Sequence, residues 1–207
     1  EVYGQGIPLV LGYPIIASTM PEDPGGAALK GYLSRLTDRY RVLVMDYPDQ
    51  GADMGRSPRI SPKELIAQRV CEDLLAVADS ARFHRFAWWG FFWGGAIGLQ
   101  LASRSARVSA LVCGGRPPLG GAYAGLLRAT RTIAENTAPD EADQVRQFVT
   151  FYESVQDWQE AEMVEKIKCP KMTYAGSDDV VELGGEIVPI APTIRERRHE
   201  LERQGWR

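Results

Sequence analysis

The chain has 207 residues, of which 44% are hydrophobic and 25% charged, and its formal net charge is −3. This length fits one domain with a sizeable core, and the slightly acidic balance excludes the basic surface typical of proteins that bind nucleic acid or anionic membranes. No stretch approaches the roughly 20 uninterrupted apolar residues needed to cross a bilayer. Residues 1–4 lack the basic and then apolar pattern of a signal peptide. We therefore expect a cytoplasmic protein with neither nucleic acid nor membrane as a partner.

Three cysteines, Cys71, Cys113 and Cys169, lie far apart in the sequence. Their odd number and wide spacing argue against a disulfide framework and against a metal site, so we expect small core residues in a reducing compartment. The glycine pairs match neither of the nucleotide-binding fingerprints. We expect no metal and no cofactor.

Short apolar runs alternate with helical patterns through the first part of the chain. Residues 7–11 and 41–45 are apolar runs that end in turn residues, which predicts two buried strands. Between them, apolar residues recur at helical spacing over 27–40. The run Ser61-Pro62-Lys63-Glu64 has the pattern of a capping box, which predicts a helix from there to about Ala81.

The stretch Phe83–Gly95 is the centre of the pattern. An aromatic run ends at Gly90, one tight turn follows, and a helix rich in small residues begins at Gly94. Small residues let the backbones of a strand and a helix approach closely. We therefore expect a buried strand, a sharp bend and a helix, with Phe92 at the bend.

The second half interrupts the alternation and then resumes it. Expected elements are a strand at 108–113, helices at 123–133, 140–151 and 158–167, a strand at 171–175, and a charged helix at 191–204 that ends at Gly205. Strands alternating with helices predict an α/β fold: a mostly parallel sheet covered by helices on both faces, with a ligand crevice at the carboxyl ends of its strands. The helical block predicts a cap over that crevice, which divides the chain into core (1–118), cap (119–167) and core (168–207). A separate helical subdomain is the alternative.

Four segments, in order, resemble the α/β-hydrolase superfamily. Residues 7–14 look like the strand before the oxyanion loop, with Leu11 in place of the usual His, and residues 46–57 look like a lengthened Asp-x-Pro-Gly-x-Gly-x-Ser loop. The run Gly90-Phe91-Phe92-Trp93-Gly94-Gly95 matches the nucleophile elbow apart from the nucleophile. Residues 167–179 look like the penultimate core strand with its Gly-x-x-Asp acid. The resemblance implies an α/β-hydrolase fold, and against it the chain looks short at both ends.

By this resemblance Asp179 is the triad acid, and the backbone N–H groups of Tyr13 and Trp93 form an oxyanion hole. Phe92 occupies the nucleophile position but has neither a lone pair to donate nor a proton to lose, so it is non-reactive. Elbow strain costs roughly 1–3 kcal/mol, which burial of a Phe side chain, worth about 1.5–3 kcal/mol, can offset. We expect a buried apolar plug rather than a relaxed turn. The expected ligand pocket comprises Tyr13, Asp46, Phe91, Phe92, Trp93 and Cys113.

The chain holds two histidines, His84 and His199, and we expect both on the surface. A triad base is therefore missing. Cys113 is a candidate replacement nucleophile, with Arg116 as the nearby cation that could activate it. Ser177 is a weaker candidate.

Three functional hypotheses follow. The first is a hydrolase-fold protein that resembles ester and amide hydrolases, lacks hydrolytic chemistry and binds a small apolar molecule under its cap. The second is an altered or truncated form of an active hydrolase of small hydrophobic esters, amides or C–C bonds, with its histidine beyond Arg207. The third is a lyase, cyclase or isomerase that uses Tyr13, Asp46, Asp49 or Asp179 for acid–base chemistry.

Overall fold

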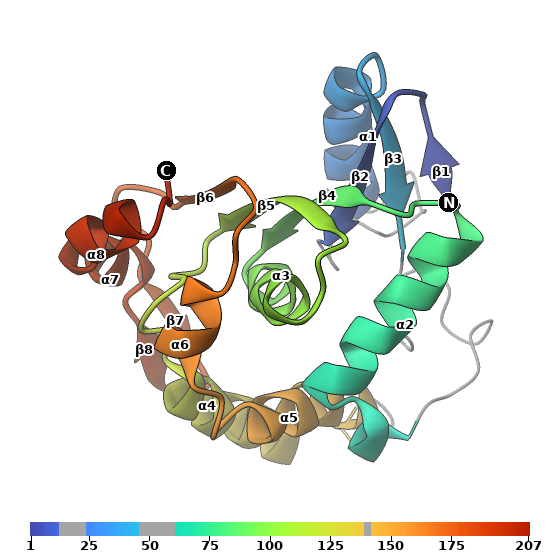
Figure 1. Cartoon of the computed structure of the whole chain (residues 1–207). Coiled ribbons are helices and arrows are strands. Elements are labelled where there is room, and N and C mark those ends of the chain that lie inside the picture. Colours follow the sequence, from blue (N-terminus) through green and yellow to red (C-terminus); the bar gives the residue numbers. More distant parts are fainter. Residues whose placement is uncertain (13–23, 46–60, 139–141) are drawn as a thin grey trace.

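The structure is a computed structural model that describes residues 1–12, 24–45, 61–138 and 142–207 (Figure 1). In chain order its elements are β1 Val2–Tyr3, β2 Ile7–Gly12, α1 Pro24–Leu36, β3 Tyr40–Val44, the 3₁₀ turn η2 Pro62–Glu64, α2 Ala67–Ser80, β4 Phe86–Phe91, α3 Trp93–Arg104, β5 Val108–Gly114, α4 Tyr123–Asn136, α5 Ala142–Ser154, α6 Glu160–Glu165, β6 Lys171–Tyr174, β7 Val181–Leu183, β8 Glu186–Val188, α7 Ile190–Glu196 and α8 Arg198–Arg203.

The main sheet has the strand order β1-β3-β2-β4-β5-β6. Only β1 runs antiparallel, against β3, and the other neighbours are parallel. Successive residues of a strand point to opposite faces, and β2 shows both faces: Leu9 and Leu11 pack with Leu29 of α1, whereas Val10 joins the main core that contains α2 and α3. The expected α/β fold, with a mostly parallel sheet covered on both faces, is confirmed.

The main core is centred on Trp88 of β4, whose side chain is fully buried. Its indole Nε1 donates a hydrogen bond to the Gly94 carbonyl at 3.0 Å, which ties the strand to the first turn of α3. A Cβ atom at Gly98 would lie 2.6 Å from the Trp88 ring, and one at Gly12 would lie 2.0 Å from it. Glycine at these two positions is therefore what lets so large a side chain lie between β2 and α3.

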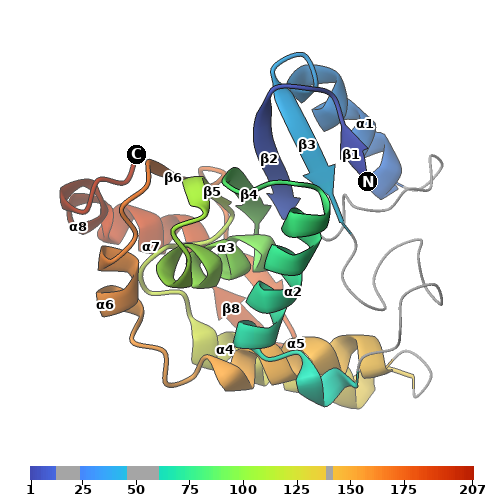
Figure 2. The ribbon, with the colours of Figure 1, turned by 45° about the vertical axis from the view of Figure 1, so that its right-hand side comes forward.

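Three helices, α4, α5 and α6, connect β5 to β6. In Figure 2, α4 and α5 cross the bottom of the molecule, the side toward which the arrowheads of β2 and β3 point. Aromatic side chains of α5 reach Trp93 at the start of α3. The division into core and cap at residues 119 and 167 stays a prediction.

The helix predicted to begin at Ser61 begins instead at Ala67. Ser61 and Glu64 close only the single turn η2, through the Glu64 N–H to the Ser61 carbonyl (2.8 Å) and the Ser61 N–H to the Glu64 carboxylate (3.2 Å). The Ala67 N–H donates to Ser154 Oγ of α5 at 2.9 Å. A side chain from 87 residues away therefore caps α2, which local sequence could not indicate.

The end of the chain also differs from its prediction. The charged helix expected over 191–204 is two short helices, α7 and α8, that meet at Arg197. A hairpin, β7–β8, precedes them and turns through Gly184 and Gly185, whose φ angles are 54° and 79°. Two-residue hairpin turns of this kind need positive φ at both positions.

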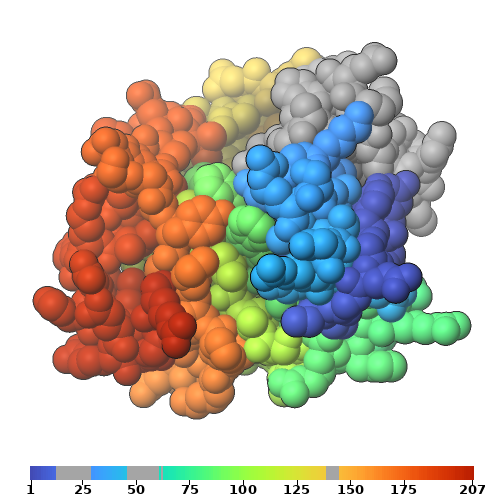
Figure 3. Space-filling model, turned by 90° about the horizontal axis from the view of Figure 1, so that it is seen from above, coloured from blue at the N-terminus to red at the C-terminus, as the bar shows by residue number. Residues whose placement is uncertain are grey.

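Residues 205–207 lie where the resemblance places the start of a further strand. Trp206 forms a parallel bridge with Lys171, and the Arg207 N–H donates to the Lys171 carbonyl at 3.2 Å. Figure 3 shows the molecule from above, with the N-terminal elements in blue and the C-terminal helices in red on opposite sides. The green β4–α3–β5 segments are visible between them.

Replacing Gly98 by Ala tests the packing around Trp88. The added methyl group meets a filled core, so we expect the free energy of unfolding to fall by about 1–3 kcal/mol. Gly31 in α1 is the matched control, since a Cβ there would meet only Arg35 Nη1 at 3.7 Å. Gly31→Ala should raise stability by roughly 0.5–1 kcal/mol because alanine favours helix. Urea unfolding followed by circular dichroism measures both, and equal effects would contradict the packing argument.

Candidate active site

The bend after β4 is strained. Phe92 has φ 50° and ψ −108°, a region that L-residues rarely adopt. Its N–H donates to the Gly114 carbonyl at 2.8 Å, and its carbonyl accepts from the Ala96 N–H at 3.1 Å. The bend is therefore held from both sides, by β5 and by α3, and the relaxed-turn alternative is wrong.

Glycines allow the strand and the helix to come together at this bend. A Cβ at Gly90 would lie 2.1 Å from the Gly94 carbonyl oxygen, and one at Gly95 would lie 2.9 Å from Arg116 Cβ. Neither position has room for a side chain. The small residues that predicted the elbow are thus required by its geometry.

Aromatic side chains fill the space around the bend. The Phe92 side chain is half-buried and packs against the main core, and the Phe91 ring lies against Gly115. Trp93 is buried, with its ring centroid 4.7 Å from that of Phe148 and 5.4 Å from that of Phe151, both in α5. The elbow and the helical connection therefore share one apolar contact surface.

The expected acid lies at the same edge of the sheet as the bend. Phe91, Gly114 and Tyr174 are neighbours in register across β4, β5 and β6. Asp179 follows Tyr174 after a turn in which its N–H donates to the Gly176 carbonyl at 3.2 Å. Asp179 is partly exposed. It follows β6, Phe92 follows β4, and one strand, β5, lies between these two.

Neither histidine of the chain lies at this edge of the sheet. His84 is exposed and lies before β4, at the amino end of the sheet. The His199 side chain is 96% exposed on α8, with Nδ1 3.8 Å from the Glu202 carboxylate. Phe92 and Asp179 therefore have no imidazole between them to carry a proton.

The candidate replacement nucleophiles are poorly placed for chemistry. Cys113 is fully buried in β5, with Sγ 3.7 Å from the Gly95 carbonyl oxygen. Burial raises the pKa of its thiol, which outweighs the opposing charge of Arg116. A buried neutral thiol is a weak nucleophile. Ser177 is exposed and donates to the Asp178 carboxylate at 3.0 Å.

Three residues of the hypotheses lie outside the described ranges: Tyr13, Asp46 and Asp49. Their roles as oxyanion donor, pocket residue or acid–base group stay predictions. Among the residues that the structure does describe, no cluster of three or more His, Cys, Asp or Glu side chains could hold a metal ion. In the same ranges no helix is both long and apolar enough to cross a membrane.

Arg116, which the sequence indicated only as a cation beside Cys113, is a buried arginine next to the elbow. Arg116 is 2% exposed, in the loop after β5, where residues 115–119 are all buried. Its guanidinium carbon lies 4.4 Å from the centre of the Tyr123 ring in α4. Its position between two glycines and two prolines was a signal, because a charged residue is rare within so apolar a turn.

Glu160 at the start of α6 lies near this arginine. Its carboxylate accepts the backbone N–H groups of Gly120 and of Gly121, the latter at 3.1 Å. Burial raises the pKa of Glu160, and the Gly120 hydrogen bond and the Arg116 charge oppose that rise. The loop after β5 is thus fastened to α6.

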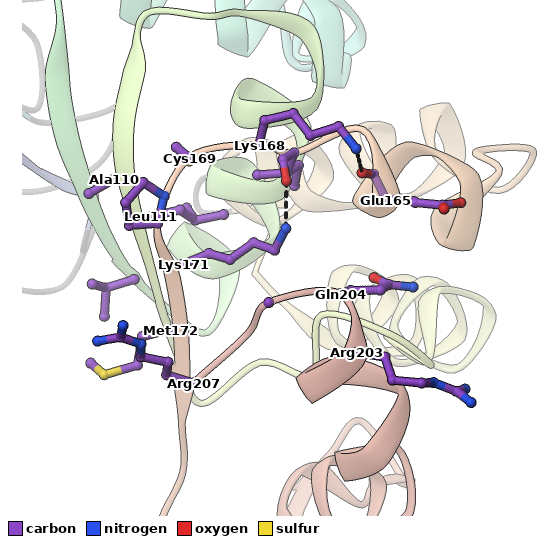
Figure 4. Close-up of a pocket in the computed structure, with 14 residues that line it drawn as sticks. Ala110, Leu111, Glu165, Lys168, Cys169, Lys171, Met172, Arg203, Gln204 and Arg207 are labelled. Carbon is purple, nitrogen blue, oxygen red and sulfur yellow. Dashed lines mark hydrogen bonds between the residues drawn. The ribbon is translucent and has the colours of Figure 1, made fainter.

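A cavity of about 860 Å³ lies away from the elbow, along β6 (Figure 4). It is lined by the middle of β5, by the first half of β6 with the segment before it, and by residues 203–205 and 207. The Lys171 ammonium group donates to the Ile167 carbonyl beside it. Phe92, Trp93 and Asp179 do not line it. We therefore place the candidate site at the elbow and not in this cavity.

Strain at Phe92 can be measured by comparing Phe92→Gly with Phe92→Ala. Glycine relieves the backbone, so we expect the Gly variant to be more stable than the Ala variant by about 1–2 kcal/mol. In an ordinary helix alanine is more stable than glycine, and Ala76 on the exposed face of α2 supplies this control. Ala76→Gly should lower the free energy of unfolding by about 0.5–1 kcal/mol. Urea unfolding gives all three values. An Ala variant as stable as the Gly variant would show an unstrained bend.

Thiol reactivity tests the burial of the cysteines. Burial raises the pKa of Cys71 to about 12 and raises that of Cys113 as well, so neither forms thiolate readily at pH 8. We expect Ellman's reagent to modify half-buried Cys169 in the native protein and the other two only after unfolding. Rapid modification of Cys113 in the folded state would restore it as a candidate nucleophile.

Comparisons with known proteins agree with this geometry. Residues 27–176 match the family described as alpha/beta hydrolase fold. The chain is 39% identical over 70 residues to the putative carbamate hydrolase RutD of Pseudomonas syringae pv. syringae (strain B728a), a match that covers 34% of this chain and 26% of that protein. The chain thus spans about a quarter of the length of this curated relative.

Solved structures show the same architecture. A hydrolase from Pseudomonas aeruginosa PA01 superimposes with a TM-score of 0.62 at 20% identity, over 86% of this chain and 75% of that one. The enol-lactonase from Burkholderia xenovorans LB400 superimposes with a TM-score of 0.61 at 18% identity, over 100% and 85%. At these identities the likeness concerns the fold alone. From the family match, the strand order and the elbow together, the chain belongs to the α/β-hydrolase-fold family.

Proposed function

We propose that this protein binds a small, largely apolar molecule beneath α4–α6 and does not hydrolyse it. The observation that carries the proposal is Phe92 at the strained bend. Acyl transfer needs a nucleophile at that point, a base within hydrogen-bond reach of it and a group that orients the base. A benzyl side chain supplies no nucleophile, and both histidines of this chain are exposed elsewhere.

The surroundings of the bend favour an apolar ligand. Trp93 and the rings of Phe148 and Phe151 meet where the elbow faces α5, and Phe91 and Tyr174 lie 6.4 Å apart between ring centroids on the β5–β6 side. Sites for small molecules are predominantly apolar with a few polar groups that set orientation. Aromatic rings gathered at a bend that cannot perform the chemistry of its fold support binding of an apolar molecule as the use of this region.

The second candidate is an altered or partial form of an active hydrolase. The specific observation in its favour is that the strain persists at Phe92, where it costs roughly 1–3 kcal/mol and serves no chemistry of phenylalanine. A protein named putative carbamate hydrolase and an enol-lactonase are among the proteins that this chain resembles. Under this alternative the parent activity is hydrolysis of a small hydrophobic ester, amide or related bond.

One compound distinguishes the two candidates. We expect p-nitrophenyl butyrate to bind the native protein saturably in calorimetry and to release no p-nitrophenol above the rate of heat-denatured protein. A fluorophosphonate probe should label no residue. Turnover or labelling in the native protein would overturn the claim that it does not hydrolyse its ligand. Absence of binding would overturn the claim that it binds a small apolar molecule of this kind.

Two variants locate the site of binding. Phe148→Ala removes a ring that contacts Trp93, so we expect at least a tenfold loss of affinity for p-nitrophenyl butyrate. Ile187→Ala on the exposed hairpin is the control and should bind as the native protein does.

Phe92→Ser places a hydroxyl group at the bend. A clear gain of esterase activity in this variant would favour the altered hydrolase.

A further inference from the structure

Buried hydrogen-bond donors without acceptors gather where the loop after β5 meets α4 and α6. We define the Arg116 cluster as Arg116, Tyr123, Trp158 and Glu160. Arg116 Nε and Nη2, Tyr123 Oη and Trp158 Nε1 are all buried and have no hydrogen-bond partner. Native interiors leave only a few such groups in every hundred residues, and the other six in the described part of this chain belong to residues outside the cluster. Four in one cluster therefore require an explanation.

The Tyr123 hydroxyl lies near both the Arg116 guanidinium and the Glu160 carboxylate and influences the pKa of each, yet none of the four buried groups reaches hydrogen-bond geometry with another member of the cluster. The guanidinium of Arg116 stacks over the ring of Tyr123, and that ring meets the Trp158 indole edge-on at 5.7 Å. Glu160 is the only acid in the cluster, and its carboxylate accepts backbone N–H groups instead. The cluster therefore has a surplus of donors.

A purely structural role explains this arrangement poorly. An arginine that fastened α6 to the core would pair directly with Glu160, yet the two do not form an ion pair or a hydrogen bond, although Nη2 and Oε1 both flank Gly121. Burying a charge that lacks hydrogen-bonded partners is energetically costly. A group that supplies oxygen acceptors to the guanidinium would recover that cost.

The position of the cluster connects it to the elbow. Arg116 follows β5, the strand beside β4, and its Cβ lies against Gly95 in the first turn of α3. Its carbonyl accepts the Thr173 hydroxyl at 3.2 Å, which holds the loop to β6. The guanidinium is thus presented from a fixed backbone, close to a helix start where partial positive charge gathers.

We propose that the Arg116 cluster binds a carboxylate group of the ligand. Nε and Nη2 of Arg116 form one free edge of the guanidinium, and two such donors match the two oxygens of a carboxylate in spacing and planarity. The Tyr123 hydroxyl and the Trp158 indole add neutral donors. The molecule under α4–α6 then has an apolar body at the elbow and an acid head at Arg116. This inference rests on the proposed function, since it names the chemistry of the same ligand.

Two probes with the same eight-carbon chain, octanoate with a carboxylate head and octanamide with a neutral head, test the inference. We expect native protein to bind octanoate at least tenfold more tightly than octanamide by calorimetry. Arg116→Met keeps the volume and removes the charge, and it should lower octanoate affinity to that of octanamide while leaving octanamide unchanged. Arg131→Met, which removes an exposed arginine of α4 paired with Glu153 at 2.6 Å, is the control and should keep the tenfold preference.

Stability separates this role from a structural one. Arg116→Met removes an unpaired buried charge, so its urea midpoint should equal or exceed that of the native protein. A fastening role predicts a lower midpoint instead. Tyr123→Phe, which removes only Oη, is the second variant and should weaken octanoate binding severalfold without affecting octanamide.

Each outcome decides between the two proposals. Equal affinity of the native protein for octanoate and octanamide would overturn the carboxylate site and leave apolar binding standing. Binding of neither probe would overturn the proposed function itself. A preference for octanoate that survives in Arg116→Met would place the acid head elsewhere and also overturn the inference.

Discussion

The contact between β4 and α3 is the constraint on which the rest of the site depends. Gly90 lies so close to the Gly94 carbonyl that no side chain fits, and the indole of Trp88 donates to that same carbonyl. The chain can reverse from strand to helix there only through one residue with an unusual backbone. Phe92 is that residue, and its conformation follows from its neighbours rather than from its own side chain.

This constraint also orders the neighbouring elements. Gly114 accepts the Phe92 N–H, so the end of β5 is fixed by the bend, and the buried loop that carries Arg116 starts from there. Trp93 is the first residue of α3 and meets the aromatic face of α5. The elbow therefore positions both polar and apolar groups around it, and this holds whatever residue occupies the bend.

Strands, the elbow and the family could be predicted from sequence because each depends on local patterns: apolar runs, small residues and turn chemistry. The start of α2 could not, since its cap comes from Ser154, which is remote in sequence. The break at Arg197 and the hairpin at Gly184 were overlooked, although paired glycines were a local signal for the turn. The Arg116 cluster depends on which donors meet an acceptor, and only coordinates reveal that.

The hydrogen bond from the Ala67 N–H to Ser154 has a dynamic consequence. This hydrogen bond joins the last turn of α5 to the first turn of α2, so the end of one helix holds the start of the other. A displacement of α5 that widened access to the elbow would strip α2 of its cap and loosen its first turn. Outward movement of α5 and fraying of α2 are therefore linked, and hydrogen exchange at residues 67–70 would report how often α5 moves away from the elbow.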